Sequence, residues 1–179
     1  MEYTDQGKFK HQIFQLNQQE LRWSPPPTGV FRLDTDGSVN LQQAACGGTI
    51  RDENGNWITG FQKRLGRVPS TIAELIGITT GLQICKQQGF DKVLVYTDSL
   101  EAIHLLMIDS GGHHPFSTEI TEGRRLIFSD WEIELRYAPR ESIQCADFLA
   151  REAHHIVEDM KILNEPHPGC FDRLRLDRV

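Results

Sequence analysis

Residues 30–61, VFRLDTDGSVNLQQAACGGTIRDENGNWITGF, decide the fold class, because they predict three short strands in succession. The first strand, Val30–Thr35, is expected to end in a turn at Asp36-Gly37-Ser38, and Ala44–Arg51 and Trp57–Phe61 predict the second and third strands. The Asn54-Gly55 pair is a hairpin signal, because these residues tolerate the positive φ of a tight turn. We therefore expect an antiparallel meander.

Helices and strands alternate after this meander. A helix is expected from Ser70 to a stop at Gly89, and the apolar run Lys92–Thr97 is typical of a strand buried on both faces. Further along, we expect a helix capped by Asp98-Ser99, a helix over Ser117–Ile127, a strand over Trp131–Tyr137 and a last helix from about Ile143 to Met160. This order favours an α/β domain with a mixed sheet and packed helices.

The chain divides into one domain and two extensions. Residues 1–29 are expected to form a flexible arm or linker with weak helix potential around Phe9–Leu21, because they are rich in Gln and end in Ser24-Pro25-Pro26-Pro27. The domain is placed at residues 30–162, and residues 163–179 are expected to form a loose C-terminal tail.

Composition narrows the possible functions. With 39% hydrophobic and 25% charged residues among 179, the chain has a globular balance and lacks an apolar run long enough to span a bilayer. Its four cysteines form no CxxC pair, which favours reduced thiols and an intracellular protein, with nucleus or cytoplasm left open. A net charge of −6 argues against nucleic-acid binding through bulk positive charge alone. We expect a monomer with no membrane partner.

Four acidic residues are placed where they could converge. Asp36 and Asp98 each follow a strand, while Glu74 and Asp147 lie early in helices next to apolar neighbours. Four carboxylates at one rim of a sheet would repel one another unless cations bind, and Mg²⁺ and Mn²⁺ prefer oxygen ligands. Two such ions can activate a water and stabilise the leaving oxygen in phosphodiester cleavage.

Each acid also has a structural interpretation that stays open. Asp98 and Asp147 suit helix caps, Glu74 suits a solvated helix face, and Asp36 before Gly37 suits a turn. Only the combination of the four indicates a metal site. Asp34 is a competing candidate, because residues two apart on a strand point to the same face.

Five motifs occur in a specific order along the chain: Thr35–Ser38, Cys46–Trp57, Ala73–Leu75, Thr97–Ser99 and Arg140–Ala150. Together they resemble the ribonuclease H family, in particular its plant reverse-transcriptase-like branch associated with non-LTR retroelements, from about Val30 to Ala153. The resemblance implies an RNase H-like α/β fold with a mixed five-stranded sheet flanked by helices. It also implies a larger retroelement polyprotein and metal-dependent hydrolysis of the RNA strand of an RNA–DNA hybrid.

The resemblance assigns roles to individual residues. Asp36, Glu74, Asp98 and Asp147 match the family's catalytic acids, which hold two Mg²⁺ ions that Mn²⁺ can replace. Asp36 and Asp98 would hold both ions, Glu74 would hold one and bond a 2′-hydroxyl, and Asp147 would hold the ion that orients the attacking water. The expected substrate-binding residues are Gly37, Ser38, Gly47, Gly48, Ser99 and Arg140. The two glycines at 47 and 48 are expected to approach the minor groove, and Arg140 a phosphate.

Two positions depart from the family pattern. Tyr137 stands where many members have a histidine, and Ile143 stands where an asparagine is expected; a basic insertion after Asp98 is also missing. These departures motivate a second hypothesis, a catalytically weak or inactive nucleic-acid-binding or interaction module. A third possibility is a nuclease of related fold that prefers DNA.

Overall fold

The computed structural model describes residues 22–108 and 112–177. In this part of the chain, six strands form one sheet in the order β5-β4-β1-β2-β3-β6. The antiparallel strands are β1 (Phe31–Asn40), β2 (Gln43–Arg51), β3 (Trp57–Gly66) and β6 (Met160–Leu163), whereas β4 (Lys92–Thr97) and β5 (Glu132–Tyr137) run parallel to β1. The mixed α/β architecture is confirmed, but the expected count of five strands is wrong, because β6 adds a strand beside β3.

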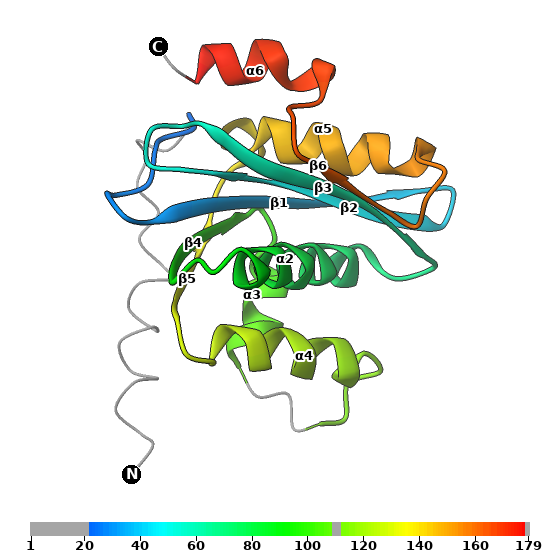
Figure 1. The fold of residues 1–179 in the computed structure, drawn as a ribbon. Helices are drawn as coiled ribbons and strands as arrows, with labels where there is room; N and C mark the ends of the chain where they lie inside the picture. The colour runs from blue at the N-terminus through cyan, green and yellow to red at the C-terminus, as the bar shows by residue number, and fades with distance from the viewer. Residues whose placement is uncertain (1–21, 109–111, 178–179) are drawn as a thin grey trace.

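Helices cover both faces of the sheet (Figure 1). On one face lie α2 (Ser70–Gln87), α3 (Leu100–Met107) and α4 (Ser117–Ile127), and on the other lies α5 (Gln144–Glu152), with α6 (Phe171–Leu176) beyond it. Short 3₁₀ helices connect these elements: η1 (Arg140–Ser142), η2 (Ala153–His155) and η3 (Pro168–Cys170). The main apolar core lies between the sheet and α2, α3 and α4, with Leu33, Phe61, Leu75 and Val95 fully buried.

The first strand is longer than expected. Asp36, Gly37 and Ser38 do not form a turn; they continue β1 and pair with Gly47, Cys46 and Ala45 of β2. The chain reverses instead at Leu41-Gln42, where both residues have positive φ. Cross-strand hydrogen bonding along the whole of β2 outweighs the local turn preference of Asp-Gly.

Both ends of the described chain pack on the domain. Trp23, expected in a linker, is buried, and its ring lies 3.6 Å from the guanidinium carbon of Arg51. The sequence favours a helix up to Met160 and a loose tail after it. In the structure α5 ends at Glu152, and the residues from Met160 on form β6, η3 and α6, with Cys170 fully buried. The possible helix around Phe9–Leu21 lies outside the described residues.

Among the described residues, no helix combines the length and apolar character that crossing a membrane requires.

Candidate functional site

Three acidic side chains that are far apart in the sequence meet at one edge of the sheet. Asp36 comes from β1, Glu74 from the second turn of α2, and Asp98 follows β4. One carboxylate oxygen from each lies within 4.8 Å of the others. Asp36 and Glu74 are buried and Asp98 is half-buried. The structure thus brings together three of the four acids that the sequence analysis singled out.

The end of β4 creates the opening in which they meet. The pairing of β1 with β4 stops at Asp34 and Tyr96, so the next part of β1, including Asp36, has no strand on that side. Asp36 lies opposite Gly47 of β2, on the face that α5 covers, whereas Gly37 faces α2. Because the two helices approach this gap from opposite faces, each can bring an acid toward Asp36.

Glycine at position 37 permits the close approach of α2. A Cβ atom built there would lie 2.8 Å from the Glu74 amide nitrogen and 3.0 Å from the Ala73 carbonyl carbon. The Gly37 amide itself donates to Asp36 Oδ1 at 3.0 Å and so holds that carboxylate. Gly37 therefore has a steric role in placing Glu74 and a polar role in placing Asp36.

Asp147, the fourth acid, lies beside the three-acid group without joining it. It is in the first turn of α5. Its Oδ2 forms an ion pair with Arg151, one helical turn later, at 2.9 Å. Arg140 Nε lies 3.4 Å from Asp98 Oδ2 and 4.0 Å from Asp147 Oδ1. Asp147 is also one of the neighbours that raise the pKa of Asp36. The two arginines hold Asp147 at the rim.

Burial and mutual repulsion make the three acids hard to ionise together. Burial, followed by the charges of Glu74 and Asp98, raises the pKa of Asp36 to about 10. Burial also raises the pKa of Glu74 to about 7, with Asp98 adding to the effect. The Asp36 carboxylate, more than the other acids, raises the pKa of Arg140. Such strongly shifted values are common at functional sites.

The chemistry of these donors fits a divalent cation. Glu74 Oε2 is buried without a hydrogen-bond partner, which is costly unless something binds it. Carboxylate oxygens at this spacing are the ligands that Mg²⁺ and Mn²⁺ prefer. A bound cation would satisfy the unpartnered oxygen and relieve the repulsion among Asp36, Glu74 and Asp98 at once.

A cavity of about 490 Å³ opens on the acids. Four of the residues expected to bind substrate line it: Gly37, Ser38, Ser99 and Arg140. Ser99 is the N-cap of α3, where its Oγ accepts from the Ala102 amide at 3.1 Å. Three further polar residues, Ser70, Thr71 and Arg151, also line the cavity; the sequence does not predict them as site residues, because a surface hydroxyl or arginine carries no local signal.

The other two glycines do not reach this cavity. Gly47 and Gly48 are buried, and a Cβ atom at Gly47 would lie 2.5 Å from the Ala150 amide nitrogen of α5. At Gly48 it would lie 2.5 Å from the Phe61 ring. The expectation that they approach a minor groove is therefore wrong, since the space left by their missing side chains is filled by α5 and Phe61.

Asp34 and the two departures from the family pattern lie elsewhere. Asp34 pairs with the buried Arg32 at 2.7 Å and is not part of the acid group. Tyr137 packs against the main core, and Ile143 is buried with Leu94 and Ala146. Neither residue is among those that line the cavity on the acids.

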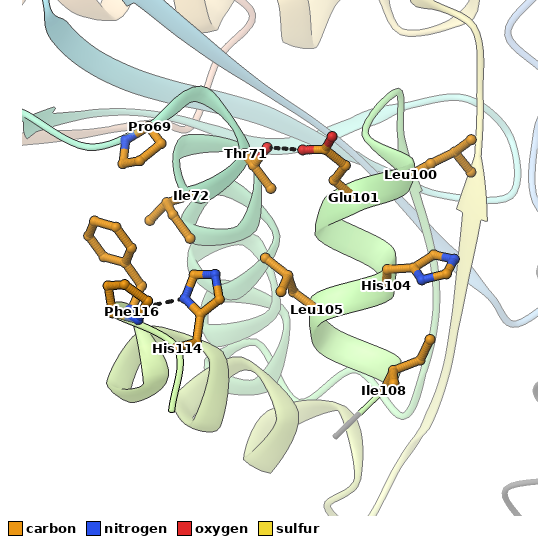
Figure 2. Close-up of a pocket in the computed structure, with 11 residues that line it drawn as sticks. Pro69, Thr71, Ile72, Leu100, Glu101, His104, Leu105, Ile108, His114 and Phe116 are labelled. Carbon is orange, nitrogen blue, oxygen red and sulfur yellow. Dashed lines mark hydrogen bonds between the residues drawn. The ribbon is translucent and has the colours of Figure 1, made fainter. Parts of the chain in front are cut away.

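A second cavity, of about 790 Å³, is drawn in Figure 2 and shares Thr71 with the first. It lies between the start of α2, the outer face of α3 and the segment His114–Phe116, and its walls are mainly apolar. Thr71 lines both cavities and donates to Glu101 Oε2 at 2.6 Å. His114 lines this cavity, and its Nδ1 accepts from the Phe116 amide at 3.1 Å.

Comparison with known proteins identifies the family. A family model described as reverse transcriptase-like matches residues 34–153, which include all four acids. The chain belongs to this reverse transcriptase-like family. A protein of Arabidopsis thaliana that is named as a ribonuclease H protein is 30% identical over 133 residues, which cover 73% of this chain and 22% of that relative. The chain thus spans about a fifth of the length of this curated relative.

Solved structures share the fold of this chain. RNase H1 from Halobacterium salinarum NRC-1 superimposes with a TM-score of 0.61 at 21% identity, over 70% of this chain and 98% of that one. LC11-RNase H1, solved in complex with an RNA/DNA hybrid, gives a TM-score of 0.61 at 20% identity, over 68% of this chain and 94% of that one. At these identities the likeness shows the RNase H fold.

Proposed function

We propose that this chain is a ribonuclease H-type endonuclease that hydrolyses the RNA strand of an RNA–DNA hybrid with divalent metal ions. The observation that carries the proposal is the convergence of Asp36, Glu74 and Asp98 within 4.8 Å, with Glu74 Oε2 buried and unpartnered. The family match and the ribonuclease H name of the Arabidopsis relative support the same class of reaction.

The residues divide into those that hold the metal and those that bind the nucleic acid. Asp36, Glu74 and Asp98 would hold Mg²⁺ or Mn²⁺, and Asp147, fixed by Arg151, would complete a second position beside Asp36. When bound, such ions activate a water molecule and stabilise the leaving oxygen of a phosphodiester. Ser38, Ser99 and Arg140 line the cavity and provide two hydroxyls and one positive charge for the RNA strand.

Choosing RNA over DNA requires contact with the ribose 2′-hydroxyl. Glu74 is the acid proposed for this role, because it lines the cavity and its Oε2 is buried without a hydrogen-bond partner. One of its oxygens can ligate the cation while the other accepts from a 2′-hydroxyl. A DNA strand offers no such donor and would leave that oxygen unpartnered.

The direct test is cleavage of an end-labelled hybrid with Mg²⁺ or Mn²⁺, alongside Asp98→Asn. The wild-type chain should cut the RNA strand at internal positions, and the variant should lose at least about a hundredfold in rate, since it removes a metal ligand. DNA duplex and RNA duplex serve as competing substrates. No metal-dependent cutting above the variant, or preferential cutting of the DNA duplex, would reject the proposal.

One observation favours a second candidate, a nucleic-acid-binding module with little catalysis. Ile143 is buried in an apolar cluster and the half-buried Tyr137 packs against the main core, and neither residue is among those that line the cavity on the acids. On this hypothesis the chain binds hybrid with a log-affinity that falls linearly with log salt, but turns it over negligibly. Measuring binding and cleavage on the same samples separates the two candidates.

The domain is also proposed to work within a larger retroelement protein. The matched region makes up 22% of the Arabidopsis relative. A foamy virus protease-reverse transcriptase shares the fold with a TM-score of 0.56, over 21% of its length. Both proteins carry such a domain as a minor part of a longer chain.

A further inference from the structure

The hydrogen bond between Ser38 and His154 links the acidic cavity to the end of the helix that carries Asp147. His154 Nε2 lies 3.0 Å from Ser38 Oγ, although 116 positions separate the two residues in the sequence. Ser38 is half-buried and lines the cavity, and His154 belongs to η2, which follows α5 directly. The bond therefore joins the wall of the cavity to a side chain outside it.

The position of Ser38 on β1 gives this bond its significance. Ser38 follows Asp36 by two residues on a strand, so both side chains point to the face that α5 covers. A two-residue step along a strand is about 7 Å, so Ser38 Oγ stands a short distance beyond the acid group in the same cavity. A sugar or phosphate group next to the reacting phosphodiester could reach it there.

A serine hydroxyl that turns freely is a poor recognition group, because binding must first fix its rotamer. A hydroxyl can donate one hydrogen bond and accept two. The imidazole occupies one of these positions and leaves the rest of the hydroxyl's capacity to the cavity. Burial, with the nearby His155, lowers the pKa of His154, so its ring stays neutral and able to share a proton with Ser38 in either direction.

We propose that His154 is a positioning residue that holds the Ser38 hydroxyl toward the cavity, where it hydrogen-bonds the sugar–phosphate backbone of the RNA strand. The inference rests on the proposed function and adds to it a residue outside the family's acids. His154 acts through Ser38 and touches no acid of the metal group. It therefore affects the binding of the hybrid more than the chemical step.

Steady-state cleavage of a hybrid by matched variants tests the proposal. The variants are His154→Ala, Ser38→Ala and the double variant, with His155→Ala as the control, because His155 is exposed on the same short helix. His154→Ala and Ser38→Ala should each raise KM about five- to tenfold, as the loss of one hydrogen bond predicts, with kcat changed less than about twofold. The double variant should be no worse than Ser38→Ala alone.

A conservative variant and a spectroscopic measurement separate positioning from folding. His154→Gln, which can place an amide nitrogen near the Nε2 position, should recover most of the lost affinity. The ¹⁵N resonance of His154 Nε2 should shift in Ser38→Ala, whatever the activity of the chain. An unshifted resonance, a His154→Ala variant that matches His155→Ala, or multiplying effects of the two single variants would overturn the proposal.

Failure of the proposed function and failure of the positioning role of His154 give different results. If the wild-type chain does not cut the hybrid at all, the proposed function fails, and the fluorescence anisotropy of a labelled hybrid then replaces KM. His154→Ala must weaken that binding relative to His155→Ala for the positioning role to stand. If the wild-type chain cuts and His154→Ala does so with unchanged KM, only the positioning role is rejected.

Discussion

The backbone of Glu74 packs directly against Gly37, in the space that a side chain at position 37 would need: a Cβ atom on Gly37 would lie 2.8 Å from the Glu74 amide nitrogen. This contact sets how closely α2 approaches β1, and it therefore sets the spacing of the acid group. A Cβ atom at this distance would be closer than packed atoms tolerate, so any residue other than glycine must push the helix outward.

Gly37→Ala should damage the site more than its small size suggests. We expect a loss of about 1–3 kcal/mol in the free energy of unfolding, from overpacking against backbone atoms that cannot move singly. Cleavage should fall by at least tenfold, because Glu74 moves away from Asp36. Urea unfolding and cleavage assays measure the two effects. Val157→Ala is the control, since Val157 is 90% exposed and does not line the cavity; equal behaviour of the two variants would count against the steric role of Gly37.

The acid group should make the metal-free protein less stable as the pH rises. The folded pKa values of Asp36 and Glu74, about 10 and about 7, lie above the unfolded values near 4. At a pH between the unfolded and the folded pKa of each acid, the folded state therefore binds more protons than the unfolded state. The free energy of unfolding should therefore decrease from about pH 4 upward, through pH 7 for Glu74 and toward pH 10 for Asp36.

Urea unfolding at pH 5, 7 and 9 in EDTA measures this slope. Asp36→Asn should flatten it, because the variant removes one buried acid and relieves the other two. Millimolar Mg²⁺ should stabilise the wild-type chain at pH 9 and have little effect on the variant, since the ion binds the folded state. A slope that Asp36→Asn leaves unchanged would contradict the assigned cause.

Arg140→Ala should change metal binding and hybrid binding in opposite directions. Arg140 lies 3.4 Å from Asp98 and 4.0 Å from Asp147, so its loss leaves these acids less compensated. The Mg²⁺ concentration for half-maximal activity should fall several-fold, while KM for the hybrid should rise and its salt slope should lessen by about one. Arg175→Ala, on α6, is the control. A higher metal requirement in Arg140→Ala would argue against this charge balance.

Trp23→Ala should destabilise the domain, although Trp23 precedes the first strand. Trp23 is 8% exposed and lies against the guanidinium groups of Arg51 and Arg32, at 3.6 and 5.1 Å. We expect a loss of about 2–4 kcal/mol from the buried ring and its cation–π contacts. Phe171→Ala, at a 56% exposed aromatic, should cost under 1 kcal/mol. Equal unfolding curves would show that the segment before Val30 does not contribute to the fold.

Local sequence patterns predicted the elements that carry the acids well. The apolar run before Thr97 marks a strand buried on both faces, so Asp98 had to lie at its end. Ser99 caps α3, as the Asp98-Ser99 pair indicates. Asp147 lies in the first turn of a helix, as its apolar neighbours suggested. In each case the signal depends on residues adjacent in the chain.

The predictions from sequence are wrong where contacts with distant residues determine the local structure. Asp36-Gly37 has the local preference of a turn, but pairing with Gly47 and Cys46 keeps it extended. The true reversal at Leu41-Gln42 has positive φ without a glycine in the turn, so it gives no local signal.

The role of a glycine is equally hard to read from the sequence. A glycine can admit a ligand or a packed neighbour, and Gly47 admits the backbone of Leu149 and Ala150, about a hundred positions away. Contacts between distant residues also form β6, whose four residues pair with β3 from far along the chain. The bond between Ser38 and His154 is a further contact of this kind.

The central claim is that Asp36, Glu74 and Asp98 hold a divalent cation in common. Crystals of the chain soaked in Mn²⁺, with anomalous diffraction recorded above the manganese edge, test it most directly. The account predicts an anomalous peak among these three carboxylates, within about 2.5 Å of oxygens from at least two of them. An empty site there, or manganese bound only elsewhere on the surface, would contradict it.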